Sequence, residues 1–168
     1  MAVRDILLLG NPRLNIVCDP IERSELDDIR EVVADLHDTL MDFRRRHGAG
    51  RAIAAPQIDV MKRLVYVHID TPTVFINPVL SDFSDDQFTL WDDCMSFPDL
   101  LVNVRRHRSC RITYRDLDWN EQSMILQDDR SELLQHECDH LDGILAVARA
   151  IDGQSFAYRS QRRVIDTR

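Results

Sequence analysis

The chain has 168 residues, of which 44% are hydrophobic and 30% charged, and its formal net charge is −8 at pH 7. This composition predicts one globular domain, residues 1–168, that is large enough to bury a core without disulfides. The acidic balance argues against a sequence-specific nucleic-acid-binding protein. No stretch has the length and apolarity of a membrane span, and the first residues lack a secretory signal pattern, so we expect a cytoplasmic protein without membrane association.

The first clear element is a helix that begins near Ser24 and ends at Gly48. Ser24 and Asp27 have the spacing of a capping box, and Gly48 is a typical helix stop. Apolar residues recur at helical spacing between them: Leu26, Ile29, Val33, Leu36, Leu40 and Phe43.

After this helix, the pattern changes to short β-branched or aromatic runs that are separated by turn residues. No helical pattern lies between the runs, which favours antiparallel meanders over parallel βαβ units. The fold class that we predict is therefore α+β, with an N-terminal helix, antiparallel β-sheets and a central metal-binding helix. The predicted strands are 64–69, 74–77, 87–91, 111–114 and 123–126.

The predicted metal-binding helix contains the pattern H-E-x-x-H at residues 136–140. His136 and His140 lie one turn apart on one helix face, and Glu137 is close enough to reach a water on an ion that both histidines bind. Asp128, at the start, suits a helix N-terminus, and Gly143 predicts the stop. A chance pattern on a helix with half-buried histidines is the alternative, and a third ligand decides between the two.

Two further stretches are candidates for the same site. Residues 50–57 form a small-residue segment that ends in Gln57, whose amide can donate hydrogen bonds to an oxyanion. In residues 91–98, a strand ends at Cys94, which makes this thiol the best candidate for the third ligand. Cys138 lies opposite the histidines on a regular helix, and no C-x-x-C pair predicts a disulfide scaffold or a four-cysteine zinc site.

The end of the chain carries four arginines, Arg159, Arg162, Arg163 and Arg168. A charged tail of this kind is usually solvated, and that is our expectation here. Contact with an anionic partner such as RNA is the alternative.

Taken together, the three stretches resemble the motifs of peptide deformylases, which are G-x-G-x-A-A-x-Q, E-G-C-L-S and Q-H-E-x-D-H-L-x-G. This chain has GRAIAAPQ, DDCMS and QHECDHLDG in the same order. The resemblance extends to about Ile151. It implies a metal-dependent hydrolase that removes the N-formyl group from the initiator methionine of nascent polypeptides at the ribosome, and so implies N-formylmethionyl peptides as substrates.

The resemblance also implies a role for each matched position. It makes Cys94, His136 and His140 the metal ligands, and Glu137 the general acid and base. Gln57 and the backbone N–H of Met95 would bind the developing oxyanion. Gly50, Ala52 and Asp93 fall at positions beside the substrate. The implied cofactor is one divalent metal ion, Fe²⁺ above all, with Zn²⁺, Ni²⁺ or Co²⁺ also compatible with the ligands.

The chain departs from these motifs at several positions. Ala52 replaces a glycine and is harmless only if its φ is negative. Asp92 and Asp93 replace Glu and Gly, and Asp93 brings a carboxylate close to the thiolate ligand. Met95 replaces Leu with similar bulk, so a role of its N–H is retained.

Two alternatives to a deformylase remain at this point. An H-E-x-x-H endopeptidase normally takes Glu or His as its third ligand and would not depend on Cys94. A deformylase-like protein with the altered second motif could instead bind metal or peptide with little turnover. Release of formate from a formyl-Met peptide distinguishes these possibilities.

Overall fold

The computed structural model describes residues 2–165, so Arg168 lies outside the described residues. Two long helices and eight strands follow one another along the chain, and a short helix, α3, ends the described part. Their bounds are α1 (Leu26–His47), β1 (Ala52–Ala54), β2 (Leu64–His68), β3 (Pro72–Ser81), β4 (Gln87–Asp93), β5 (Leu100–His107), β6 (Ser109–Arg115), β7 (Glu121–Gln127), α2 (Asp128–Leu141), β8 (Phe156–Tyr158) and α3 (Arg162–Ile165).

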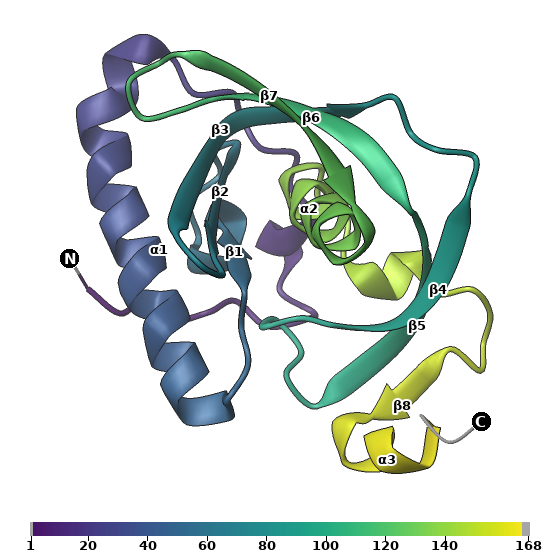
Figure 1. Ribbon diagram of the computed structural model, residues 1–168. Helices are drawn as coiled ribbons and strands as arrows, with labels where there is room; N and C mark the ends of the chain where they lie inside the picture. The colour runs from purple at the N-terminus through teal and green to yellow at the C-terminus, as the bar shows by residue number, and fades with distance from the viewer. Residues whose placement is uncertain (1, 166–168) are drawn as a thin grey trace.

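The strands form two antiparallel sheets around the central helix α2 (Figure 1). One sheet has the order β1-β2-β3-β6-β7, and the other has the order β4-β5-β8. The helix α1 lies outside the first sheet, next to β1 to β3 (Figure 1). The predicted α+β class, with an N-terminal helix and antiparallel sheets, is confirmed.

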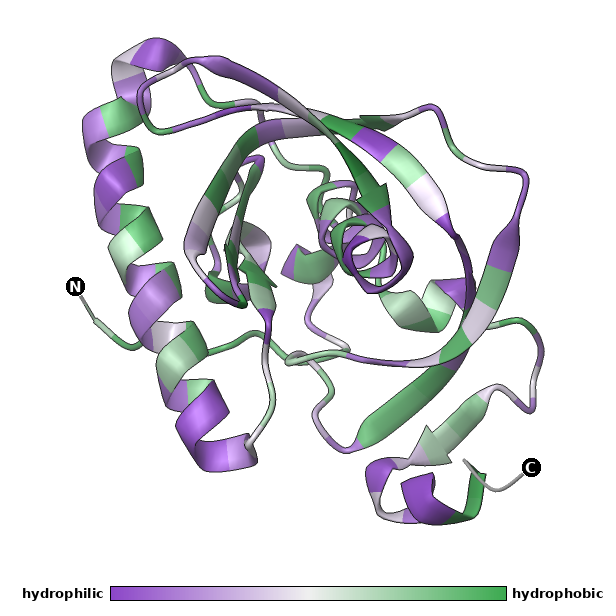
Figure 2. Cartoon of the chain, in the orientation of Figure 1, coloured by the Kyte–Doolittle hydropathy of each residue, from purple (hydrophilic) through white to green (hydrophobic). Residues whose placement is uncertain are grey.

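The strand β2 separates the two larger parts of the core. Leu64 and Tyr66 pack with apolar residues of α1 such as Leu36 and Leu40. Val65, on the opposite face, belongs to the cluster that contains the α2 leucines. Because both faces of β2 are covered, its sequence is a continuous apolar run instead of an alternating one. The hydropathy pattern of Figure 2 shows apolar residues recurring along α1, as expected for a helix that packs one face against a sheet.

The amino end of α1 differs from the prediction. Glu22 and Glu25 form the capping box, and the Glu22 backbone N–H donates a 2.8 Å hydrogen bond to Glu25 Oε2. Ser24 lies inside a 3₁₀ turn, Arg23–Glu25, so the predicted Ser24–Asp27 box is wrong. The predicted stop is right, because Gly48 has φ of 67° and its N–H donates to the carbonyl of Arg44.

Three strands were absent from the sequence-based prediction. The strand β1 consists of alanines around one isoleucine, and this composition does not favour a strand by itself. In β5, Arg105 and Arg106 interrupt the apolar pattern. The strand β8 lies in the tail that we expected to be solvated, and it pairs with β5 through Leu100 to Val102. Phe156 and Tyr158 remain 44% and 71% exposed, so this part of the tail is ordered against β5 and still in contact with solvent.

Among residues 2–165, no helix combines the length and the apolarity that a membrane span needs.

Candidate metal centre

The helix α2 begins and ends with backbone features that fix its position. Asp128 lies in its first turn, as predicted, together with Asp129. The hydroxyl of Ser131, which follows in the helix, donates a hydrogen bond to the carbonyl of His107. At the other end, Gly143 has φ of 71°, and a Cβ built there would lie 2.6 Å from the backbone oxygen of Asn15. The chain therefore passes close to the amino-terminal segment directly after the helix.

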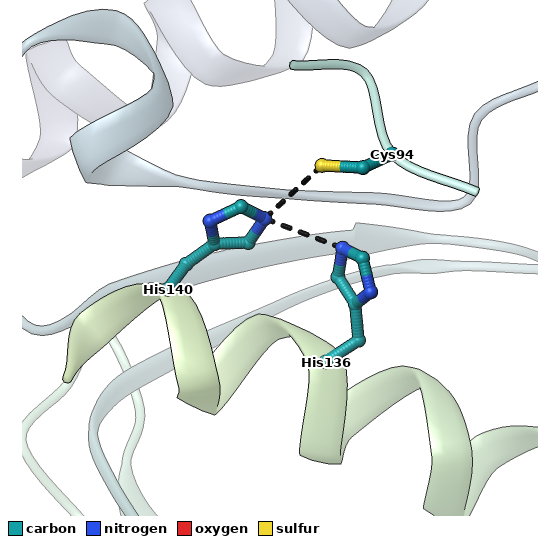
Figure 3. A group of neighbouring side chains, drawn as sticks. All are labelled: Cys94, His136 and His140. Atoms are coloured by element: carbon teal, nitrogen blue, oxygen red, sulfur yellow. Dashed lines mark hydrogen bonds between the residues drawn. The ribbon is translucent and has the colours of Figure 1, made fainter. Parts of the chain in front are cut away.

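Three side chains from two segments meet beside α2. The Sγ atom of Cys94, in the turn after β4, lies 3.3 Å from Nε2 of His140, which is 3.2 Å from Nε2 of His136 (Figure 3). The three candidate ligand atoms all lie within 4.8 Å of one another. All three residues are buried. The structure thus brings together the two histidines of the motif and the cysteine expected as the third ligand.

A chain of buried charges fixes the orientation of His136. The Oδ2 atom of Asp92 lies 2.9 Å from Nδ1 of His136 and 3.3 Å from Nη2 of Arg106. Arg106 also donates a 2.6 Å hydrogen bond to Asp139, which Arg149 contacts as well. Since an ionised carboxylate only accepts hydrogen bonds, Nδ1 carries a proton, and in the neutral ring Nε2 is left with a lone pair. Arg106 thus connects Asp92 with Asp139.

The charges around the cluster favour a positive charge at its centre. Burial acts to raise the pKa of Asp92, but His136 and Arg106 lower it overall, so this carboxylate stays ionised. Burial acts to lower the pKa of His136, but Asp92 and Cys94 raise it well above its ordinary value. Burial and the neighbouring His136 together lower the pKa of His140. The raised pKa means that a proton on His136 can supply this positive charge, and a metal ion that binds Nε2 would replace that proton. The donor set itself, one sulfur and two imidazole nitrogens, fits a divalent metal with an open position.

Glu137, the residue after His136 on α2, lines a pocket together with Cys94 and His136. Its side chain is buried, and its Oε2 atom has no hydrogen-bond partner among residues 2–165. Burial raises the pKa of Glu137 to about 7. A carboxyl group with such a pKa can both accept and return a proton near neutral pH.

Gln57 and Met95 line the pocket beside the cluster. Gln57 accepts a 2.9 Å hydrogen bond from the Ala54 N–H, which turns its Nε2 towards Cys94 Sγ at 3.5 Å and Ser96 Oγ at 3.2 Å. In the part of the chain that the structure describes, the Met95 N–H has no hydrogen-bond partner. Both groups line one pocket together with Cys94, His136 and Glu137.

The same pocket is lined by Gly50, Ala52 and Asp93. Ala52 and Asp93 are not among the described residues with positive φ, so neither substitution strains the backbone. The pocket also contains residues that sequence reasoning missed, namely Arg51, Asp92, Glu132 and Arg159. Asp92 could have been found, because it precedes Cys94 by two residues. No local signal identifies Arg159, which reaches the pocket only because β8 pairs with β5.

Cys138 does not belong to the cluster, as its helix position predicts. Burial raises its pKa, so it is a neutral thiol at ordinary pH.

Comparisons with known proteins identify similar chains. Residues 3–155 match the family model described as polypeptide deformylase. The chain is 35% identical over 181 residues to a peptide deformylase of Leptospira biflexa, covering 99% of this chain and 97% of that protein. It is 36% identical to peptide deformylase 1 of Prochlorococcus marinus, and the alignment covers 96% of this chain and 88% of that protein.

Solved structures agree with these relatives. A class I type b peptide deformylase from Acinetobacter baumannii, solved with Met-Ala-Ser bound, superposes with a TM-score of 0.80 at 26% identity. The alignment covers 88% of this chain and 98% of that one. A peptide deformylase from Thermotoga maritima, at 22% identity, has the same fold with a TM-score of 0.82 and covers 90% of this chain and 100% of its own.

Proposed function

Because the chain belongs to the peptide deformylase family, we propose that its buried cluster is the active site of a metal-dependent deformylase, with residues 1–168 acting as one domain. The reaction hydrolyses the formamide at the amino terminus of a formyl peptide, such as the formyl-methionine that begins a nascent polypeptide. Its products are formate and a free amino group. The observation that supports this assignment most strongly is the convergence of Cys94, His136 and His140 beside Glu137, whose Oε2 has no hydrogen-bond partner within the described part of the chain.

Cys94, His136 and His140 would hold the metal ion, and Asp92 would keep His136 in the tautomer that leaves Nε2 available. A divalent ion in this position supplies a polarised water and an electrophilic contact for the carbonyl oxygen. Glu137 accepts a proton from the water that attacks the formyl carbon, and then donates it to the nitrogen that leaves.

Gln57 and Met95 would stabilise the negative charge that develops on the formyl oxygen. The Gln57 amide is fixed with its N–H donors towards the site, and the Met95 N–H has no other partner among the described residues. One donor of this kind typically contributes about 3 kcal/mol to transition-state stabilisation. Gly50, Ala52 and Asp93 would contact the rest of the substrate, because they line the same pocket.

For the physiological metal we propose Fe²⁺, while Zn²⁺, Ni²⁺ or Co²⁺ suit the same ligands. We expect the substrate to be the nascent chain at the ribosome, and therefore a cytoplasmic location. Metal analysis of protein purified without oxygen tests which metal the protein binds.

The decisive test measures formate release from formyl-Met-Ala-Ser by the metal-loaded protein. We expect release by the wild type, loss of metal and activity in Cys94→Ala, and retained metal with about a thousandfold lower turnover in Glu137→Gln. An H-E-x-x-H endopeptidase would instead cleave internal peptide bonds. A binding protein with little turnover would hold metal and release no formate, and either result would overturn the proposal.

A further inference from the structure

A second cavity lies along another face of α2. Its volume of about 340 Å³ is within the range of about 300–1,000 Å³ that is typical of small-molecule sites. Among residues 2–165, it shares no lining residue with the pocket that contains Cys94 and His136. The α2 residues of its lining are spaced three and four positions apart, so they share one helix face: Gln135, Cys138, Asp139 and Asp142. This cavity is therefore separate from the metal centre, and we call it the arginine cavity after the residues described next.

Two arginines of the lining come from segments that pair with each other. An antiparallel bridge joins Val104 of β5 to Ala150, and this pairing brings Arg105 and Arg149 close together. Like charges at neighbouring positions of paired segments repel each other, and an anion between them relieves the repulsion. Arg149 has Asp139 as its partner, whereas the exposed Arg105 has no ion pair or side-chain hydrogen bond within the described residues. Arg105 therefore provides a free guanidinium group at the cavity.

The arginine cavity carries a surplus of positive charge. The charged groups of its lining are Arg105, Arg106, Arg149, Asp139 and Asp142, and their ion-pair partners outside the lining are Arg63 and Asp92. Four guanidinium groups therefore accompany three carboxylates, which leaves at least one positive charge unbalanced. The chain as a whole has a net charge of −8, so the cavity is opposite in sign to the rest of the molecule. A local surplus of this kind attracts anions.

The guanidinium groups also retain hydrogen-bond donors. The Arg106 side chain is only 4% exposed, and its Nη1 and Nη2 bind Asp139 and Asp92. Its Nε has no hydrogen-bond partner in the part of the chain that the structure describes, and a buried donor without an acceptor is unfavourable. Arg149 binds Asp139 through Nε and Nη2, and its Nη1 makes no hydrogen bond within residues 2–165. Carboxylate and phosphate groups match the planar donor array of arginine, so these groups suit the free donors.

The remaining part of the lining suits an apolar group. Phe83 is 45% exposed although it is a large hydrophobic side chain, and its ring centroid lies 4.9 Å from that of His107. Leu80 and the neutral thiol of Cys138 complete this part of the lining. An aromatic or aliphatic group that covers Phe83 would gain from the burial of apolar surface.

We propose that the arginine cavity is a binding site for a small organic anion. Arg105, Arg106 and Arg149 bind its carboxylate or phosphate group, and Phe83 contacts the apolar or aromatic group attached to it. This site is additional to the proposed deformylase centre and does not depend on that activity.

The test is calorimetric titration of the metal-loaded protein with phenyl phosphate, benzoate and inorganic phosphate at constant ionic strength. We expect saturable binding of phenyl phosphate or benzoate, and the tighter of the two identifies the anionic group that the arginines prefer. Its affinity should exceed that of inorganic phosphate by at least about tenfold, because only the aromatic anions cover Phe83. Phe83→Ala should remove this difference. Benzyl alcohol, which has the ring without the charge, should not bind.

Arg105→Leu should weaken binding of the aromatic anion at least about tenfold, because a charge-assisted hydrogen bond is lost. The matched control is Arg23→Leu, which removes another exposed arginine that has no ion pair within the described residues and lies outside the cavity. It should leave the affinity unchanged. Arg159→Leu, in the pocket of the metal centre, should also bind as the wild type does. Formate release by Arg105→Leu should equal that of the wild type, which shows that the variant is folded.

The absence of saturable binding, or equal affinities in Arg105→Leu and the wild type, would overturn the proposal. Binding that is lost in Arg159→Leu and kept in Arg105→Leu would mean that the anion binds beside the metal, and this result also contradicts it. Equal affinities for inorganic phosphate and the aromatic anions would refute the assigned ligand class. Because these titrations do not require turnover, failure of the deformylase assay leaves their outcome unaffected.

Discussion

Asp92 Oδ2 lies 2.9 Å from Nδ1 of His136 in the lining of the pocket, and both side chains are buried. Asp92 occupies the position at which the second family motif has Glu, so a shorter carboxylate here reaches the metal-binding histidine. Arg106 contacts the same oxygen and connects it to Asp139 of α2. The orientation of a candidate ligand on α2 therefore depends on a carboxylate from strand β4.

The substitution Asp92→Asn should weaken metal binding by about 10- to 100-fold. Asparagine keeps the shape of the side chain but removes the charge that fixes the His136 tautomer, and it leaves Arg106 with only Asp139 as an ionic partner. A competition titration against a chromogenic chelator measures the affinity.

The conservative variant Asp92→Glu keeps a carboxylate and should retain metal affinity within about tenfold of the wild type. Equal affinities in Asp92→Asn and the wild type would show that the carboxylate does not orient the ligand.

Reactivity of the four cysteines should separate Cys94 from the others. Burial raises the pKa of Cys18 to about 11 and also raises that of Cys110 and Cys138, so at pH 8 these groups are thiols and react slowly. Cys94 lines the pocket. We expect iodoacetamide to label Cys94 alone in metal-free protein at pH 8, and bound metal to protect it.

Because a thiol whose pKa is raised forms its thiolate only at higher pH, labelling of Cys18 should increase as the pH approaches 11. Mass spectrometry of peptides identifies the labelled sites, and denatured protein provides the control in which all four cysteines react. Rapid labelling of Cys18 in the folded protein at pH 8 would contradict the prediction.

The helices and the candidate metal ligands could be predicted because they are marked by short sequence patterns. The periodicity of Leu36, Leu40 and Phe43 identifies α1, and the spacing of His136 and His140 places both on one face of α2. Cys94 could be predicted as a partner because it ends a strand with a clear β pattern. These features depend on residues that are near one another in the sequence.

The features that were missed depend on contacts between distant segments. The sequence of β5 by itself does not predict that Arg106 is buried. Its charge is stabilised in the interior by ion pairs with Asp92 and Asp139. Arg159 reaches the pocket because residues 156–158 pair with β5, and this pairing has no sequence signature of its own. The positions of these two arginines are therefore set by the tertiary structure and not by local sequence.

The substitution Gly143→Ala should destabilise the fold by at least about 2 kcal/mol. Gly143 has φ of 71°, which is unfavourable for alanine, and the new Cβ would lie 2.6 Å from the Asn15 backbone oxygen, so the backbone must shift.

The matched control is Gly48→Ala. Gly48 has φ of 67°, but a Cβ built there has no atom within 4 Å, so this substitution should lower the free energy of unfolding by only about 1 kcal/mol. Urea denaturation measures both, and equal losses would show that the contact with Asn15 is unimportant.

Metal removal should lower the thermal stability of the protein, because the three candidate ligands come together only in the folded chain. At a free metal concentration of 100 times the Kd, binding adds about 2.7 kcal/mol to the free energy of unfolding. For a chain of this size, that corresponds to an increase in Tm of roughly 5–10 °C.

Cys94→Ala should lose this increase in Tm, because two imidazoles alone bind the ion weakly. Cys138→Ala should keep it, even though a buried thiol is removed, because Cys138 lies outside the cluster. Calorimetry with and without metal makes the comparison, and an undiminished increase in Cys94→Ala would exclude this thiol as a ligand.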